Sequence, residues 1–228
     1  MAKHVGIVAC SAEGAALCYR TLAAEAGERM GEHDHPEVTM HTHPLARYMV
    51  HIRAGDWPVV GELMLSSARI VAAAGADFAI CPDNTIHEAF EHVEPYSPIP
   101  WLHIAREVAR EAKARGFGAV GVLGTKYLMT GPVYADALAA EGIERLIPDP
   151  DERERIDAVI FGELVRGVFT GQSRAQFSGI IGRLAARGAR AVVLGCTEIP
   201  LLVSEADSPL PTLDSTRILA RAALREAI

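Results

Sequence analysis

The sequence predicts an α/β protein of two pseudo-symmetric halves, each a doubly wound parallel sheet with helices on both faces. Short apolar strands alternate with longer helical segments along the 228 residues. The strands expected at 78–81 and 192–194 are apolar throughout, which is typical of a sheet covered on both faces. Each follows a Gly-Ala pair, and the two pairs lie about half the chain apart. We therefore expect two similar units.

The expected elements follow a βα order in both halves. In the first half we expect strands at 5–9, 38–41 and 78–81, a helix that ends near residue 27 and a helix at 57–74. In the second half we expect helices at 103–115, 130–140, 155–167 and 174–187, with strands at 119–123, 143–147 and 192–194. A final helix follows Asp214-Ser215, which resembles an N-cap. The domains predicted are 1–98 with 209–228, and 103–208.

Composition excludes several classes of protein. The chain has 22 Lys and Arg against 29 Asp and Glu, a net charge of −7 and no basic cluster, which argues against a nucleic-acid partner. The apolar stretch at 5–9 is too short for a signal sequence or a membrane span, so no membrane partner is expected. Four cysteines without small-domain spacing indicate reduced thiols and a cytoplasmic location.

Four histidines within residues 33–43 are the only hint of a metal site. They lack the helical pair or the thiols of a zinc site, so no metal is expected. His41 falls in the expected strand at 38–41 and the other three in a loop, and we expect one or two of the four to border a polar pocket. Arg47 follows this loop, and it either faces the same pocket or lies on the surface of the next helix.

Asp83 and Cys196 are the candidate reactive groups. Each stands eight residues past the glycine of its Gly-Ala pair and directly follows its strand, where open α/β sheets bind ligands. Asn84 and Thr85 follow Asp83, and Thr197 follows Cys196. These hydroxyl and amide groups can bind a carboxylate. A helix N-terminus nearby favours an anion and a thiolate.

Two opposed acid/base groups beside a bound carboxylate suit proton transfer at the α-carbon of an amino acid. One group removes a proton from one face and the other delivers a proton to the opposite face, which is racemisation without a cofactor. Gly124-Thr125 is a further candidate anion-binding turn. The GxGxxG match at 116–121 follows a helix and enters a strand, the reverse of a dinucleotide-binding fingerprint. We expect the substrate in a cleft between the two halves.

These residues resemble the signatures of the aspartate/glutamate racemase family, the pyridoxal-independent amino-acid racemases. The similar stretches are 82–87, 124–125, 161–167, 195–200 and 211–216. The resemblance implies two α/β domains related by a pseudo-twofold axis, an active site between them, an amino-acid substrate, no cofactor and commonly a homodimer. Glu198 after Cys-Thr resembles the aspartate racemase branch. Ser11 matches the family's first-strand turn, and Arg166 either reaches a substrate carboxylate or is solvated.

The predicted site combines these assignments. The expected catalytic residues are Asp83 and Cys196, and the expected substrate-binding residues are Ser11, Arg47, Asn84, Thr85, Thr125, Arg166, Thr197 and Glu198. The chain departs from the family at Asp83, where the first signature usually has a cysteine. Cys81 lies two residues earlier, but the eight-residue register selects Asp83.

The departure at Asp83 leaves three hypotheses. A carboxylate can act as the second base of a racemase or epimerase, which we favour. It can instead bind the substrate ammonium and leave Cys196 to work alone, as in the related arylmalonate decarboxylases, or the chain can be a cis–trans isomerase of a dicarboxylic acid. The third hypothesis is a binding protein that has kept the cleft and lost turnover.

Overall fold

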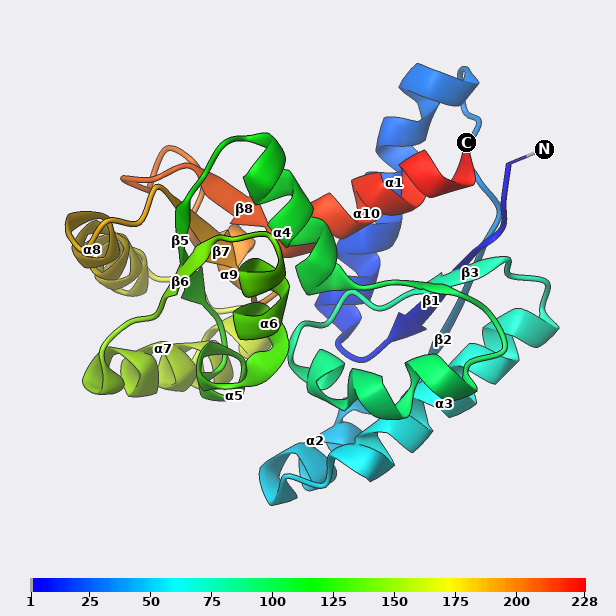
Figure 1. Ribbon diagram of the computed structural model, residues 1–228, viewed down its shortest axis with the longest axis horizontal. Coiled ribbons are helices and arrows are strands. Elements are labelled where there is room, and N and C mark those ends of the chain that lie inside the picture. The colour runs from blue at the N-terminus through cyan, green and yellow to red at the C-terminus, as the bar shows by residue number, and fades with distance from the viewer. Residues whose placement is uncertain (1) are drawn as a thin grey trace. The chain divides into compact units, whose positions relative to one another are not determined.

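The computed structural model describes residues 2–228 (Figure 1). The chain divides into two compact units. The first contains the residues up to Glu107 together with Thr216–Ile228, and the second contains Val108–Ser215. The division falls inside the helices α4 (Ile104–Ala114) and α10 (Ser215–Ala227). Each unit is built around its own parallel sheet.

The sheet of the first unit has four parallel strands in the order β2-β1-β3-β4. They are β1 (Val5–Ala9), β2 (Val38–Thr42), β3 (Phe78–Ile80) and β4 (Trp101–Leu102). Every residue of β1 is buried, since this strand lies between β2 and β3. Val5 pairs with Val38 on one side and with Phe78 on the other, so the carboxyl ends of all three strands lie at one edge.

Helices cover both faces of this sheet (Figure 1). They are α1 (Ala12–Met30), α2 (Leu45–Ala54), α3 (Trp57–Ala73), the 3-10 helices η1 (Thr85–His92) and η2 (Glu94–Tyr96), and α10. On one face, Leu22 of α1 and Leu219 of α10 belong to the same buried cluster as Ile7. On the other, α3 approaches so closely that a Cβ on Gly6 would lie 2.7 Å from Val71 Cγ2. Only glycine permits that approach.

The second unit repeats the topology with the order β6-β5-β7-β8, again all parallel. Its strands are β5 (Ala119–Leu123), β6 (Glu144–Leu146), β7 (Ala191–Leu194) and β8 (Thr212–Asp214). By their place in the sheets, β1 is equivalent to β5, and β3 is equivalent to β7. The prediction of two α/β halves with parallel sheets is confirmed.

The helices of the second unit supply most of its core. Besides most of α4, they are α5 (Lys126–Thr130), α6 (Pro132–Ala140), α7 (Pro150–Gly162), the 3-10 helix η3 (Leu164–Arg166), α8 (Gly171–Ala186) and α9 (Ile199–Leu202). Ile156 of α7 and Phe177 of α8 are fully buried in one cluster with Val192 and Leu194 of β7. Full burial of such a side chain contributes about 1.5–3 kcal/mol.

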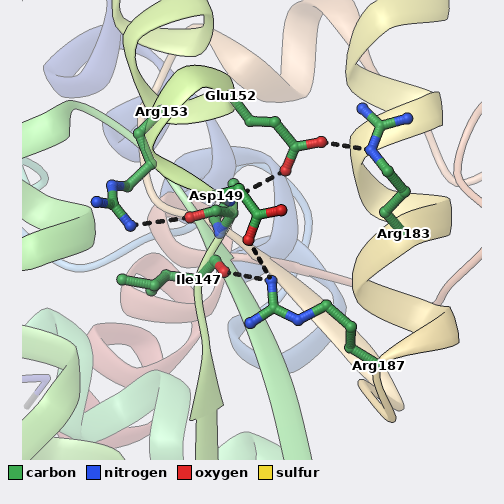
Figure 2. Close-up of polar contacts among 7 residues, drawn as sticks. Ile147, Asp149, Glu152, Arg153, Arg183 and Arg187 are labelled. Carbon is green, nitrogen blue, oxygen red and sulfur yellow. Dashed lines mark hydrogen bonds and ion pairs between the residues drawn. The ribbon is translucent and has the colours of Figure 1, made fainter.

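A polar network joins the start of α7 to the end of α8 (Figure 2). Glu152 accepts a hydrogen bond from the Asp149 N–H at 3.1 Å, as in a capping box, and it also pairs with Arg183 of α8. Arg187 donates to the carbonyl of Ile147 at 2.8 Å. Arg183 is exposed whereas Glu152 is buried, so the pair is only partly screened by water. The network holds the start of α7 against the end of α8.

The structure differs from the sequence prediction in four places. Residues 103–107, predicted in the second domain, lie in the first unit. We expected no strand at 212–214, but β8 extends the second sheet, so residues 209–215 lie in the second unit and not with the first domain. The helix predicted at 130–140 begins earlier and is broken between α5 and α6, because Pro132 has no N–H to continue it. The helix predicted at 155–167 begins at Pro150, a residue favoured in the first helical turn.

Within residues 2–228, none of the helices combines the length and the hydropathy needed to cross a membrane. No group of three or more His, Cys, Asp or Glu side chains in this range is placed to hold a metal ion.

Candidate active site

Two predicted site residues accept backbone N–H groups where helices begin at the carboxyl edge of the first sheet. Ser11 follows β1, and its hydroxyl accepts a hydrogen bond from the Gly14 N–H at 3.2 Å. Asp83 follows β3, and its Oδ1 accepts from the Ile86 N–H at 3.3 Å. Because β1 and β3 are hydrogen-bonded neighbours, both turns lie at the same edge. Both side chains are half-buried, so each can meet a ligand.

The turn that carries Asp83 is fixed by a buried histidine. His87 donates from Nδ1 to the Asp83 carbonyl at 2.6 Å, and its Nε2 accepts from the Ile104 N–H at 3.5 Å. Burial lowers the pKa of His87 to about 4, so the ring is neutral and serves as donor and acceptor at once. Asn84 is buried and Thr85 half-buried where η1 begins beside this turn.

Cys81 does not supply the thiol that Asp83 replaces. It is fully buried, and burial, followed by the nearby Asp83 charge, raises the pKa of its thiol. Its Sγ lies 4.0 Å from the Asp83 carbonyl oxygen. A thiol in these surroundings stays protonated and faces the protein interior. Asp83 is therefore the half-buried acid/base group that follows β3.

Arg47 lies on α2 and is both exposed and tethered to the histidine loop. Its guanidinium donates to His43 Nδ1 at 3.1 Å, and His43 Nε2 lies 3.1 Å from the Ser66 hydroxyl. Burial, and next the Arg47 charge, lowers the pKa of His43. The neutral ring therefore keeps Nδ1 available as an acceptor. Of the four histidines in the loop, His43 thus has a defined task, which is to orient Arg47.

In the second unit, β5 and β7 end side by side. The Gly195 N–H donates to the Leu123 carbonyl at 2.7 Å, and a Cβ on Gly195 would lie 2.8 Å from that oxygen. Only glycine fits between β7 and Cys196. Thr125, after β5, caps α5 by accepting from the Leu128 N–H at 3.2 Å. Thr125 and Cys196 therefore follow neighbouring strands, as Ser11 and Asp83 do in the first unit.

The carboxylate of Glu198 is in hydrogen-bond contact with the Cys196 thiol. Its Oε2 accepts hydrogen bonds from Cys196 Sγ at 2.9 Å and from the Thr197 hydroxyl at 2.8 Å. Glu198 is 3% exposed and Thr197 is also buried, whereas Cys196 is half-buried. The Cys196 S–H is therefore directed at a carboxylate, and a negative charge beside a thiol disfavours the thiolate. We predicted Glu198 as a substrate-binding residue, but its carboxylate is directed at the thiol.

Arg166 lies on η3, the single 3-10 turn between α7 and α8, and its side chain is exposed. Both alternatives that the sequence left open, contact with a substrate carboxylate and solvation, agree with this position. A substrate-binding role for Arg166 stays a prediction.

The fold and these strand-end groups define a class: a two-unit α/β protein with one acid/base residue after the same strand of each sheet. Residues 7–223 match the family model described as Asp/Glu/hydantoin racemase. The chain belongs to this family, as its signatures predicted. Racemases are isomerases, so family membership makes this chain an isomerase.

Individual relatives agree with this assignment. The chain is 22% identical over 188 residues to the broad specificity amino-acid racemase RacX of Bacillus subtilis (strain 168), covering 82% of this chain and 80% of RacX. It is 27% identical to the structure of an aspartate racemase homologue from Pyrococcus horikoshii OT3, with a TM-score of 0.86 and coverage of 100% and 99%. An aspartate racemase from Picrophilus torridus, 21% identical with a TM-score of 0.79 and coverage of 99% and 94%, shares the fold.

Proposed function

We propose that this protein is a cofactor-independent racemase or epimerase of an acidic or related amino acid. Asp83 and Cys196 transfer protons on opposite faces of the α-carbon. One observation carries the proposal: these two residues follow β3 and β7, which occupy the same place in two sheets of identical topology.

A two-base reaction requires the two groups to be in complementary protonation states. Asp83 accepts a backbone N–H, which suits a carboxylate, and the Cys196 S–H donates to Glu198, which suits a thiol. Asp83 can then take the α-proton of one enantiomer while the Cys196 S–H protonates the opposite face. This turnover leaves Asp83 protonated and Cys196 a thiolate, which is the form that converts the other enantiomer. Hydroxyl and backbone donors stabilise the enolate-like intermediate.

Two further properties of the proposal rest on the family and the composition. The family resemblance supports a homodimer. Reduced thiols support a cytoplasmic location, where thiols are kept reduced.

Solvent exchange tests the function directly. Each enantiomer of aspartate and of glutamate is incubated with the protein in D2O, and α-deuterium is followed by NMR and optical rotation by polarimetry. We expect deuterium uptake from both enantiomers of at least one amino acid and decay of rotation to zero, because the equilibrium constant of racemisation is one. Absence of exchange with every amino acid would contradict the proposal.

A single-thiol reaction is the second candidate function. It is favoured by one observation, that Cys196 is half-buried whereas the other three cysteines are buried. In that case Asp83 binds the substrate and Cys196 alone protonates an enolate. Release of CO2 from substituted malonates, or conversion of maleate to fumarate, without α-proton exchange of amino acids would favour this reading.

Glu198→Gln tests whether Glu198 holds Cys196 protonated. Glutamine keeps an oxygen that can accept from Cys196 and Thr197 but removes the negative charge, so the thiolate should form at lower pH. We expect alkylation of Cys196 by iodoacetamide at pH 7 to become about tenfold faster, the effect of a shift of about one pH unit. Mass spectrometry of the modified peptide gives the rate.

The matched control is Glu163→Gln. Glu163 is a half-buried carboxylate of the same unit that accepts from the Ser173 hydroxyl at 2.5 Å. Its substitution should leave alkylation of Cys196 unchanged. Slower alkylation in Glu198→Gln would show that Glu198 withdraws the thiol proton instead of holding it in place.

A further inference from the structure

Tyr48 has a buried hydroxyl without a protein partner. The residue is 0% exposed, and within residues 2–228 no atom makes a hydrogen bond with its hydroxyl oxygen. Its ring lies 6.4 Å from that of His43, centroid to centroid, at the end of β2. Buried polar groups are nearly always hydrogen-bonded, so this exception calls for a physical explanation.

The surroundings place this hydroxyl near the carboxyl edge of the first sheet. Burial is the largest cause that raises the pKa of Tyr48, followed by electrostatic interactions with Cys81, Cys10 and Asp83, so these three residues lie near the phenol. Cys10 directly follows β1, Cys81 directly follows β3, and Asp83 lies two residues beyond Cys81. The nearby Ser67 hydroxyl favours the phenolate, but its geometry falls short of a hydrogen bond. Tyr48 is therefore a neutral proton donor beside the turn that carries Asp83.

Packing alone does not explain a tyrosine at this position. Phenylalanine would fill the same space without the penalty of an unsatisfied buried hydroxyl. Tyr134 in the second unit provides the contrast. It is equally buried, but its hydroxyl is not among the buried polar atoms of residues 2–228 that lack a hydrogen-bond partner. An acceptor from outside the chain would satisfy the Tyr48 hydroxyl.

We propose that the Tyr48 hydroxyl is a substrate-binding group that donates its hydrogen bond to a carboxylate oxygen of the amino-acid substrate. The inference rests on the proposed function. Arg47, the preceding residue on α2, carries a cation tethered at the end of β2, so an anion bound at this edge meets positive charge as well as the donor. The hydroxyl is left unpaired in the ligand-free protein and is paired when the substrate binds.

Tyr48→Phe separates this role from a structural one. If the hydroxyl is unpaired, its removal should leave the melting temperature of the ligand-free protein unchanged or raise it by a few degrees. The same substitution should weaken binding of L-aspartate about tenfold or more, as expected for a lost hydrogen bond to a charged group. Differential scanning fluorimetry and isothermal titration calorimetry measure the two quantities. Tyr134→Phe, which loses a satisfied hydrogen bond, should lower the melting temperature.

Three results would overturn the proposal, and a fourth separates it from the racemase function. A melting temperature of Tyr48→Phe as low as that of Tyr134→Phe overturns the proposal, because the hydroxyl then has a partner in the ligand-free protein. Unchanged affinity for L-aspartate overturns it as well, and so does a wild-type protein that binds no L-aspartate. If the wild type binds L-aspartate without racemising it and Tyr48→Phe loses that binding, the inference stands and the racemase function falls.

Discussion

Cys196→Ser should lower racemisation at least about 100-fold while α-proton exchange of one enantiomer in D2O survives. Serine keeps the shape of the side chain but its hydroxyl is a much weaker acid than the thiol. It therefore cannot transfer protons at the face of the α-carbon that Cys196 acts on. Asp83 still removes a proton from its own face and returns deuterium to the same face. That substrate is labelled without inversion. NMR for the label and polarimetry for the inversion distinguish the two events.

Asp83→Asn should give the mirror result. Cys196 then exchanges the α-proton of the opposite enantiomer, and inversion is lost to a similar extent. The pattern of exchange is the informative measurement, because an equilibrium constant of one forces kcat/KM to be equal in the two directions for any racemase. Retention of exchange in opposite enantiomers by the two variants is the signature of a two-base reaction.

The buried thiol of Cys81 supplies the control for both variants. Cys81→Ala should retain exchange and inversion of both enantiomers, since the residue is fully buried and its thiol stays protonated. If Asp83→Asn racemises at the wild-type rate while Cys81→Ala does not, the second base is Cys81. If Asp83→Asn and Cys81→Ala both keep the wild-type activity and only Cys196→Ser loses it, the single-thiol reaction gains support.

The strand-end position of Asp83 and Cys196 followed from the sequence because buried parallel strands have a strong signal. β3 and β7 are short apolar runs, each preceded by a glycine that ends a helix. β4 and β8 gave no such signal. They are two and three residues long, too short for any hydrophobic period to show. The assignment of residues 209–215 failed for the same reason.

Within the site, residue types were predictable but side-chain directions were not. The sequence places Glu198 two residues after Cys196, yet only coordinates show that its carboxylate faces the thiol. His43 meets Ser66 across 23 positions of the chain, and no local pattern reports that contact. In the sequence, nothing distinguishes Tyr48 from an ordinary core residue of α2. Its importance comes from a hydrogen bond that the protein does not make.

Acidification should destabilise this protein through two buried histidines before most carboxylates titrate. Burial lowers the pKa of His87 to about 4, and burial, followed by the adjacent His87, lowers the pKa of His103 to about 2. The geometry agrees with neutral rings: His87 Nε2 faces the Ile104 N–H and His103 Nδ1 faces the Arg106 N–H at 3.4 Å. Protonation would set N–H against N–H in both places.

The sign of the effect follows from proton linkage. In the unfolded chain both histidines have a pKa near 6.5, so between about pH 6.5 and 4 the unfolded state binds up to two more protons than the folded state. The free energy of unfolding should therefore be fully present above pH 6.5 and fall as the pH is lowered, with a slope that approaches about 2.7 kcal/mol per pH unit. Urea denaturation at a series of pH values measures this slope.

His103→Asn is the decisive variant. Asparagine offers an oxygen near the position of Nδ1 and is a good N-cap for α4, but it does not titrate. The slope between pH 6 and 4.5 should fall by about one proton, or about 1.4 kcal/mol per pH unit. His33→Asn, a change at an exposed histidine, should leave the slope as it is. An unchanged slope in His103→Asn would mean that the buried pair is protonated in the folded protein, against the contacts that both rings make.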